Sequence, residues 1–158
     1  MTSPLGTAGA TAARASFRKL HVGDSWTTVR GSFDRLSPLL RHDLVNQGVS
    51  TSLLMALLAT YNRVSKQEVY GVIGISEKTA GRRKHEMLPR EAADATLALI
   101  EITSLAERVL GSHAEAEQWL VTPALGLDGR KPIELIATRA GAEMVKAHLV
   151  RIDHGVYA

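Results

Sequence analysis

The residues whose types and spacing are suited to chemistry lie in a basic run near the middle of the chain. Behind one glycine turn come Ser76, Lys78, Thr79, Arg82, Arg83 and Lys84. Hydroxyl groups and cations at the N-terminal end of a helix contact phosphates and base edges when that helix enters the major groove of DNA. Arginine and lysine also bind guanine specifically. We therefore predict that these six residues bind DNA.

The distribution of charge agrees with that prediction. The net charge of +3 conceals a segregation, because residues 63–90 carry +4 and residues 91–122 carry −5. A compact basic block next to an acidic one is typical of a phosphate-facing module joined to a different one. Solvated helix faces of alternating sign are the alternative interpretation.

Catalytic patterns are absent from the sequence. The six histidines are scattered, without the i, i+4 spacing of a helical metal site, and no nucleophile elbow or complete P-loop occurs. His113, Glu115 and Glu117 resemble an acid–base cluster, but acids at the start of a helix favour its dipole. We expect a binding protein with no catalytic residue, metal site or cofactor.

The elements around the basic run predict a helix-turn-helix. A helix is expected over 53–61, and Ser65 with Glu68 forms a capping box that opens a second helix, which ends at Gly74. Ser76 caps a third helix that we expect to continue through Glu86. Two short helices around a glycine turn are the arrangement of a helix-turn-helix.

The rest of the chain predicts an all-α protein. Aromatic residues make up only 4% of the sequence, which favours helices over a β-sandwich. A long helix over 91–110 is apolar on most of its circumference, so it forms a homodimer interface or is buried inside the monomer. Further helices are expected from Ser112, from Pro132 and from Thr138, the last of them ending at Gly155.

The N-terminal segment and the environment of the protein follow from composition. Residues 1–16 are mostly Ala, Thr, Ser and Gly without an apolar period, so we expect a disordered tail. The chain has no cysteine, no membrane-length apolar run and no signal-peptide core. We expect a soluble, cytoplasmic protein.

The C-terminal third resembles a known family. The order of its motifs is Trp119-Leu120, Pro123, a loop with Gly129, then Pro132-Ile133, Thr138 with Gly141, and a terminal helix with Arg151-Ile152. Taken whole, this order closely resembles the toxin-binding domain of the Xre/MbcA/ParS antitoxins. Upstream, Gly74 to Ser76 and Thr79 to Arg83 look like the Xre-type helix-turn-helix of that family, so the resemblance covers roughly residues 50–158.

The resemblance implies an antitoxin of a type II toxin–antitoxin system. Its partner would be a RES-domain toxin that degrades NAD or uses it for ADP-ribosylation, and the antitoxin would obstruct the NAD-binding active site. The helix-turn-helix, usually as a homodimer, would bind operator DNA as a transcriptional repressor of the shared operon. A stand-alone transcriptional regulator, with a C-terminal domain that dimerises or senses a ligand, is the alternative.

Within this resemblance we assign domains and toxin-binding residues. Residues 1–45 are a tail and an unassigned segment, 46–111 the helix-turn-helix and dimerisation region, and 112–158 the toxin-binding domain. The NAD cleft of such a toxin accommodates a pyrophosphate, so cations and a chain terminus are suited to it. The residues predicted to bind toxin are Arg139, Lys146, Arg151, Tyr157 and Ala158.

Overall fold

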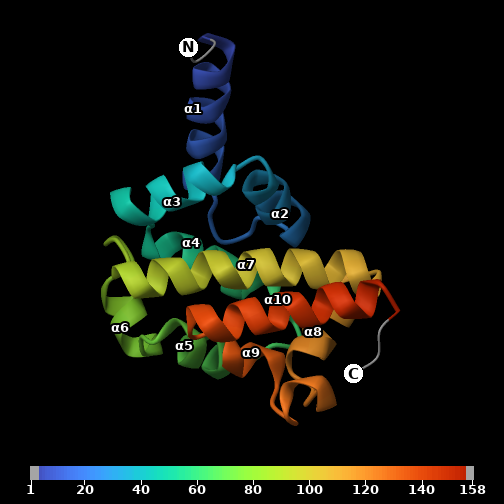
Figure 1. The fold of residues 1–158 in the computed structure, drawn as a ribbon. Helices are drawn as coiled ribbons and strands as arrows, with labels where there is room; N and C mark the ends of the chain where they lie inside the picture. The colour runs from blue at the N-terminus through green and yellow to red at the C-terminus, as the bar shows by residue number, and fades with distance from the viewer. Residues whose placement is uncertain (1–3, 156–158) are drawn as a thin grey trace.

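A long central helix organises the molecule. In the computed structural model, which describes residues 4–155, α7 (Arg90–Leu110) runs through the middle of the fold (Figure 1). It ends at Gly111, whose φ of 103° is a left-handed conformation that favours glycine. Its apolar residues are buried against five other helices of the same chain. Of the two alternatives for this segment, the structure thus shows burial inside the monomer.

The other elements surround α7 in chain order. They are α1 (Pro4–Arg18), α2 (Trp26–Asp34), α3 (Pro38–Gln47), α4 (Thr51–Thr60), α5 (Lys66–Ile73), α6 (Glu77–Arg82), α8 (His113–Leu120), the 3-10 turn η1 (Leu125–Leu127), α9 (Pro132–Leu135) and α10 (Arg139–Asp153). The predicted all-α fold is confirmed. Within the described residues, no helix is long and apolar enough to cross a membrane.

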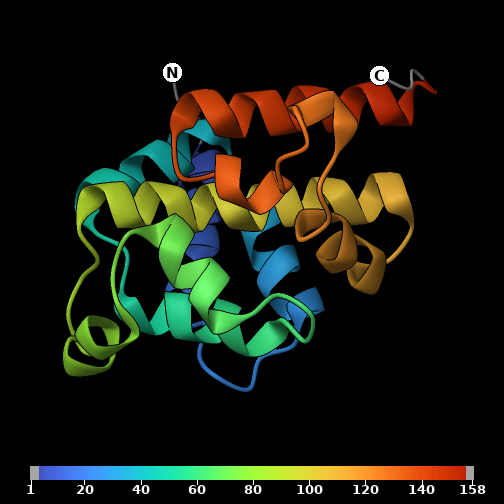
Figure 2. The ribbon, with the colours of Figure 1, turned by 90° about the horizontal axis from the view of Figure 1, so that it is seen from below.

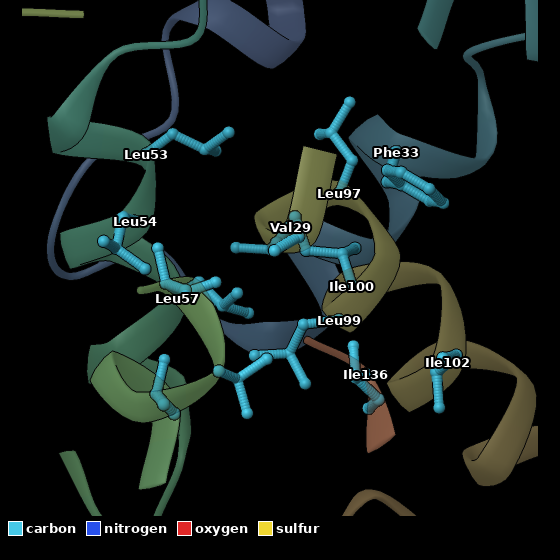
Figure 3. Packing of buried hydrophobic residues seen from close by; sticks show 14 of the residues in the cluster. Val29, Phe33, Leu53, Leu54, Leu57, Leu97, Leu99, Ile100, Ile102 and Ile136 are labelled. Carbon is cyan, nitrogen blue, oxygen red and sulfur yellow. The ribbon is translucent and has the colours of Figure 1, made fainter. Parts of the chain in front are cut away.

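A single core joins the N-terminal, middle and C-terminal helices. Figure 3 shows side chains from α2, α4 and α7 converging with one from the end of α9. The labelled residues are Val29, Phe33, Leu53, Leu54, Leu57, Leu97, Leu99, Ile100, Ile102 and Ile136. Because these helices share one buried cluster, each segment is fixed relative to the others by packing.

The start of the second short helix of the basic region agrees with prediction, but its end does not. The capping box of Ser65 and the left-handed Gly74 are both present. The expected continuation of α6 through Glu86 is wrong, because the helix ends at Arg82. The following segment pairs instead with the start of α4: Leu88 N donates to the Val49 carbonyl at 2.7 Å. That extended pairing is incompatible with helix.

The predicted disordered tail is wrong for residues 4–16, which belong to α1. Ala13 and Phe17 are buried, and the Phe17 ring lies 6.3 Å from that of Phe33 on α2. This anchor at the C-terminal end orders an alanine-rich segment of high helix propensity. The N-terminal half of α1 projects from the body (Figure 1), and residues 6–9 are exposed.

Candidate functional site

The predicted DNA-binding residues lie together on and just after α6. The Ser76 hydroxyl accepts a hydrogen bond from the Thr79 amide at 3.0 Å and donates one to the Thr79 hydroxyl at 2.8 Å. Ser76 therefore acts first as the N-cap of α6. Ala80 is fully buried and anchors the helix from beneath. Both hydroxyl residues are structural at this point of the fold, whatever else they contact.

The cations of this segment are exposed. Lys78 and Arg82 lie on α6, whereas Arg83 and Lys84 follow it in a turn. Arg83 Nε lies 3.7 Å from a carboxylate oxygen of Glu86, a solvent-exposed pair of little energetic weight. The structure thus keeps all six predicted residues in one basic segment, two of them outside the helix in which they were expected.

A buried glutamate joins this region to the C-terminal helices. Glu117 on α8 is 1% exposed. Its Oε1 accepts backbone hydrogen bonds from Asn62, Arg63 and Val64 at 2.7, 2.9 and 3.3 Å. Residues 62–64 form the connection that leads into α5, so one carboxylate holds the entry to the basic region. The sequence carried a signal for it, because Glu117 lies on the apolar face of α8 with Leu120.

An aromatic stack extends this connection to α2. The His113 ring lies 4.7 Å from the Trp26 ring and 5.9 Å from the Tyr61 ring, nearly parallel to both. His113 Nε2 lies 3.1 Å from the Thr60 carbonyl oxygen and 3.5 Å from Glu117 Oε2. The stack thus brings the α4–α5 connection, α8 and α2 to one point.

Hydrogen bonds at the two edges of the stack fix its outer rings. Trp26 Nε1 donates to Glu107, which also pairs with Arg30 at 2.9 Å. The Tyr61 hydroxyl lies 2.8 Å from that of Thr103, and burial raises the pKa of Tyr61. His113 and Glu117 are therefore parts of a structural joint rather than the acid–base pair that the sequence allowed.

A second polar contact links α5 to α9. Glu68, already engaged in the capping box with Ser65, lies 3.4 Å from Lys131 Nζ. Burial opposes ionisation of Glu68, but the hydrogen bonds from Ser65 and the charge of Lys131 outweigh it and lower the pKa of Glu68. Lys131 is the residue before α9, so this pair ties the first short helix to the C-terminal unit.

Close backbone packing sets the orientation of α10. A Cβ atom on Gly141 would lie 1.9 Å from the carbonyl oxygen of Leu135, so only glycine fits there. The Thr138 side chain caps α10 by accepting from the Gly141 amide at 3.0 Å. The start of α10 is thereby fixed against the end of α9.

The predicted toxin-binding cations on α10 differ in their surroundings. Lys146 pairs with Glu143 at 2.6 Å and with Glu101 on α7 at 3.7 Å. Its hydrogen bond and charge lower the pKa of Glu143. Arg139 and Arg151 are exposed, and neither makes an ion pair within residues 4–155. Tyr157 and Ala158 lie outside the described residues.

The inner face of α10 carries a buried histidine. His148 is 6% exposed and its ring stacks on Trp119 of α8 at 6.2 Å. Burial, and then the positive charge of Arg151, lower the pKa of His148. Trp119 is partly buried, whereas Leu120 is fully buried. The Trp-Leu pair therefore packs α8 against α10.

A groove of about 620 Å³ runs between α3, α7 and α10. Its lining mixes cations and acids, among them Arg41, Arg90, Asp94, Arg139 and Lys146. Arg41 Nε is buried without a hydrogen-bond partner in the described part of the chain. Its guanidinium lies 4.0 Å from the Phe33 ring centre, in a cation–π contact.

Comparisons with known proteins identify the C-terminal unit. Residues 105–155 match the family described as "Antitoxin Xre/MbcA/ParS C-terminal toxin-binding domain". This range contains the end of α7 and everything through α10. The joint at Glu117 and the exposed cations of α10 therefore belong to a toxin-binding domain of that family.

Two curated relatives extend the similarity over most of the chain. The "Prs ADP-ribosylating antitoxin" of Sphingobium sp. (strain YBL2) is 24% identical over 135 residues, covering 78% of this chain and 84% of the relative. "Antitoxin Xre" of Yersinia enterocolitica serotype O:8 / biotype 1B (strain NCTC 13174 / 8081) is 25% identical over 119 residues, covering 73% and 80%. The predicted resemblance to the Xre/MbcA/ParS antitoxins is confirmed, and a toxin is the partner that this family domain indicates.

Proposed function

We propose that this protein is the non-enzymatic antitoxin of a type II toxin–antitoxin pair. In this proposal its C-terminal domain covers the NAD-binding active site of a RES-domain toxin, and the helices α5 and α6 bind operator DNA. The observation that carries the proposal is the toxin-binding domain match over residues 105–155. The printed name of the Sphingobium relative refers to ADP-ribosylation, which favours a toxin that consumes NAD.

The surface of α10 supports the toxin-binding part. Arg139 and Arg151 are exposed at its two ends, and an NAD cleft is built to accept the negative charge of a pyrophosphate. Lys146 is held by two carboxylates, so we assign it a smaller share of the contact. Tyr157 and Ala158 stay in the proposal as terminal contacts.

The exposed cations after Gly74 support the DNA-binding part. Two short helices with a left-handed glycine between them, followed by Arg82, Arg83 and Lys84, suit a helix-turn-helix. Because such proteins read two half-sites as dimers, the proposal includes a cytoplasmic homodimer acting as repressor. The apolar faces of α7 are used inside the chain, so the dimer contact belongs to another surface.

The test is growth and intracellular NAD while the reading frame adjacent to this gene is induced, with and without this protein. Toxicity and NAD loss that this protein reverses, together with co-purification of the two chains, are the expected results. A control chain lacking residues 105–158 should fail to rescue. If the adjacent product is harmless and does not bind, the antitoxin function is refuted.

The second candidate is a stand-alone transcriptional regulator with a ligand-sensing C-terminal domain. The charged groove between α3, α7 and α10 favours it, since a small molecule could enter there. Operator binding is expected under both functions. Only the regulator would bind its operator normally yet neutralise no toxin.

A further inference from the structure

The helix α10 is apolar on two faces, and the fold uses only one of them. Ala142, Val145 and Leu149 are buried against α7 and the rest of the domain. On the opposite side Met144 is 51% exposed and Val150 is 48% exposed. Exposed Ala147 lies between them, three positions from each, so the three are neighbours on the helix surface. We call Met144, Ala147 and Val150 the outer patch.

Nothing in the described part of the chain covers this outer patch. Figure 2 shows α10 along one edge of the molecule, with the other helices on its inner side. Large exposed apolar side chains elsewhere are isolated: among residues 6–155, Met144 and Val150 are the only two that share a helix. A helix that presents an apolar cluster outward commonly inserts it into the groove of a partner.

The surroundings of the outer patch define the chemistry of that partner. Arg139 and Arg151 lie at the two ends, about 18 Å apart along the helix axis at 1.5 Å per residue. Glu143, which is paired with Lys146, borders one side. A complementary surface therefore has an apolar hollow with a carboxylate at each end.

The composition of the outer patch favours a separable partner over a permanent dimer. Obligate homodimer interfaces are large and strongly apolar, whereas non-obligate ones combine a small apolar centre with a polar rim. The outer patch has only two large apolar side chains, within a rim that includes arginine and glutamate. It also lies wholly inside residues 105–155, the range that matches a toxin-binding domain.

We propose that the toxin docks on the outer patch of α10, with Met144 and Val150 inserted into an apolar hollow of its surface. This inference rests on the proposed antitoxin function and specifies where its partner binds. The basic segment around α6 lies at the opposite edge of the molecule (Figure 2). A toxin seated on α10 therefore leaves the cations of that segment accessible.

The experiment compares Met144→Glu/Val150→Glu with Leu39→Glu. Leu39 on α3 is 68% exposed, so it controls for placing a carboxylate on an exposed apolar site elsewhere. The affinity of each full-length chain for the purified product of the adjacent reading frame is measured by calorimetry. We expect the double variant to weaken binding at least about 30-fold, as for removal of hot-spot side chains. Leu39→Glu should stay within about threefold of wild type.

Two further measurements separate docking from folding and from self-association. The melting temperature of the double variant should match that of wild type, because substitutions at exposed sites change stability little. The conservative pair Met144→Leu/Val150→Ile should bind toxin normally. Wild-type affinity in the double glutamate variant would overturn the outer patch alone, as would disruption of a homodimer with toxin affinity unchanged. A wild-type chain that binds no toxin would overturn the proposed function and this inference together.

Discussion

Replacing Glu117 tests the joint between the toxin-binding domain and the entry to the basic region. In Glu117→Ala, the backbone amides of residues 62–64 lose the oxygen that now accepts all three hydrogen bonds. A hydrogen bond to a charged group contributes about 1.5–3 kcal/mol. Asn62 and Arg63 are exposed and can turn to water, whereas Val64 is buried and cannot. We therefore expect a loss of about 3–4 kcal/mol rather than three full bonds.

The isosteric variant separates charge from shape. Glu117→Gln retains an acceptor oxygen, but charge-assisted bonds are roughly twice as strong as neutral ones. We expect it to cost about 1–2 kcal/mol. The control is Glu115→Ala on the same helix, whose exposed side chain contributes less than about 1 kcal/mol through the helix dipole.

The measurement is the free energy of unfolding from denaturant titration, supported by melting temperatures. For a chain of this size a loss of about 3 kcal/mol lowers the melting temperature by roughly 6–12 °C. Hydrogen exchange should also increase first in residues 62–64 of the variant, because their amides lose their acceptor. If Glu117→Ala and Glu115→Ala proved equally stable, the carboxylate would not hold the connection and the reasoning would fail.

Four further predictions follow from the structure. Gly141→Ala should cost at least about 2 kcal/mol, because its Cβ would clash with the last carbonyl of α9, whereas Gly71→Ala in open space should gain about 0.5–1 kcal/mol; thermal melts compare them. Burial and a nearby arginine lower the pKa of His148, so the neutral ring stabilises the fold above pH 6.5 and that contribution is lost as the pH falls through the folded-state pKa. His148→Phe should flatten the stability profile between pH 7 and 5, and an unchanged profile would contradict this. Arg82→Ala with Arg83→Ala should weaken operator binding and reduce its salt slope by about 0.9 for each phosphate that is no longer neutralised, as gel shifts at several salt concentrations would show. Toxin and operator DNA should bind together, giving a supershifted band instead of competition.

Local interactions explain what the sequence predicted correctly. The capping box of Ser65, the end of α5 at Gly74 and the cap of α10 by Thr138 each depend on groups within a few residues of one another. The identity of such residues is enough to place a helix end. The apolar width of 91–110 likewise predicted a helix covered on most sides, and the sequence order of the C-terminal motifs indicated the toxin-binding domain.

Contacts between distant segments explain the errors. Residues 4–16 carry no apolar period of their own, and they are helical because Phe17 packs on α2. The end of α6 at Arg82 follows from the pairing of residues 86–88 with 49–51, which no local pattern encodes. In each case a tertiary contact outweighed the local preference.

The sequence by itself determined the helices, their caps, the basic segment and the family of the C-terminal domain, because short-range hydrogen bonds and composition define them. Only the tertiary structure decided that α7 is buried inside the chain and that Glu117 is a joint rather than a reactive group. Glu117 meets Asn62 across 55 residues, and Trp26 meets Glu107 across 81. Such contacts exist only once the core brings the segments together. The same packing turned one apolar face of α10 inward and left Met144 and Val150 outward.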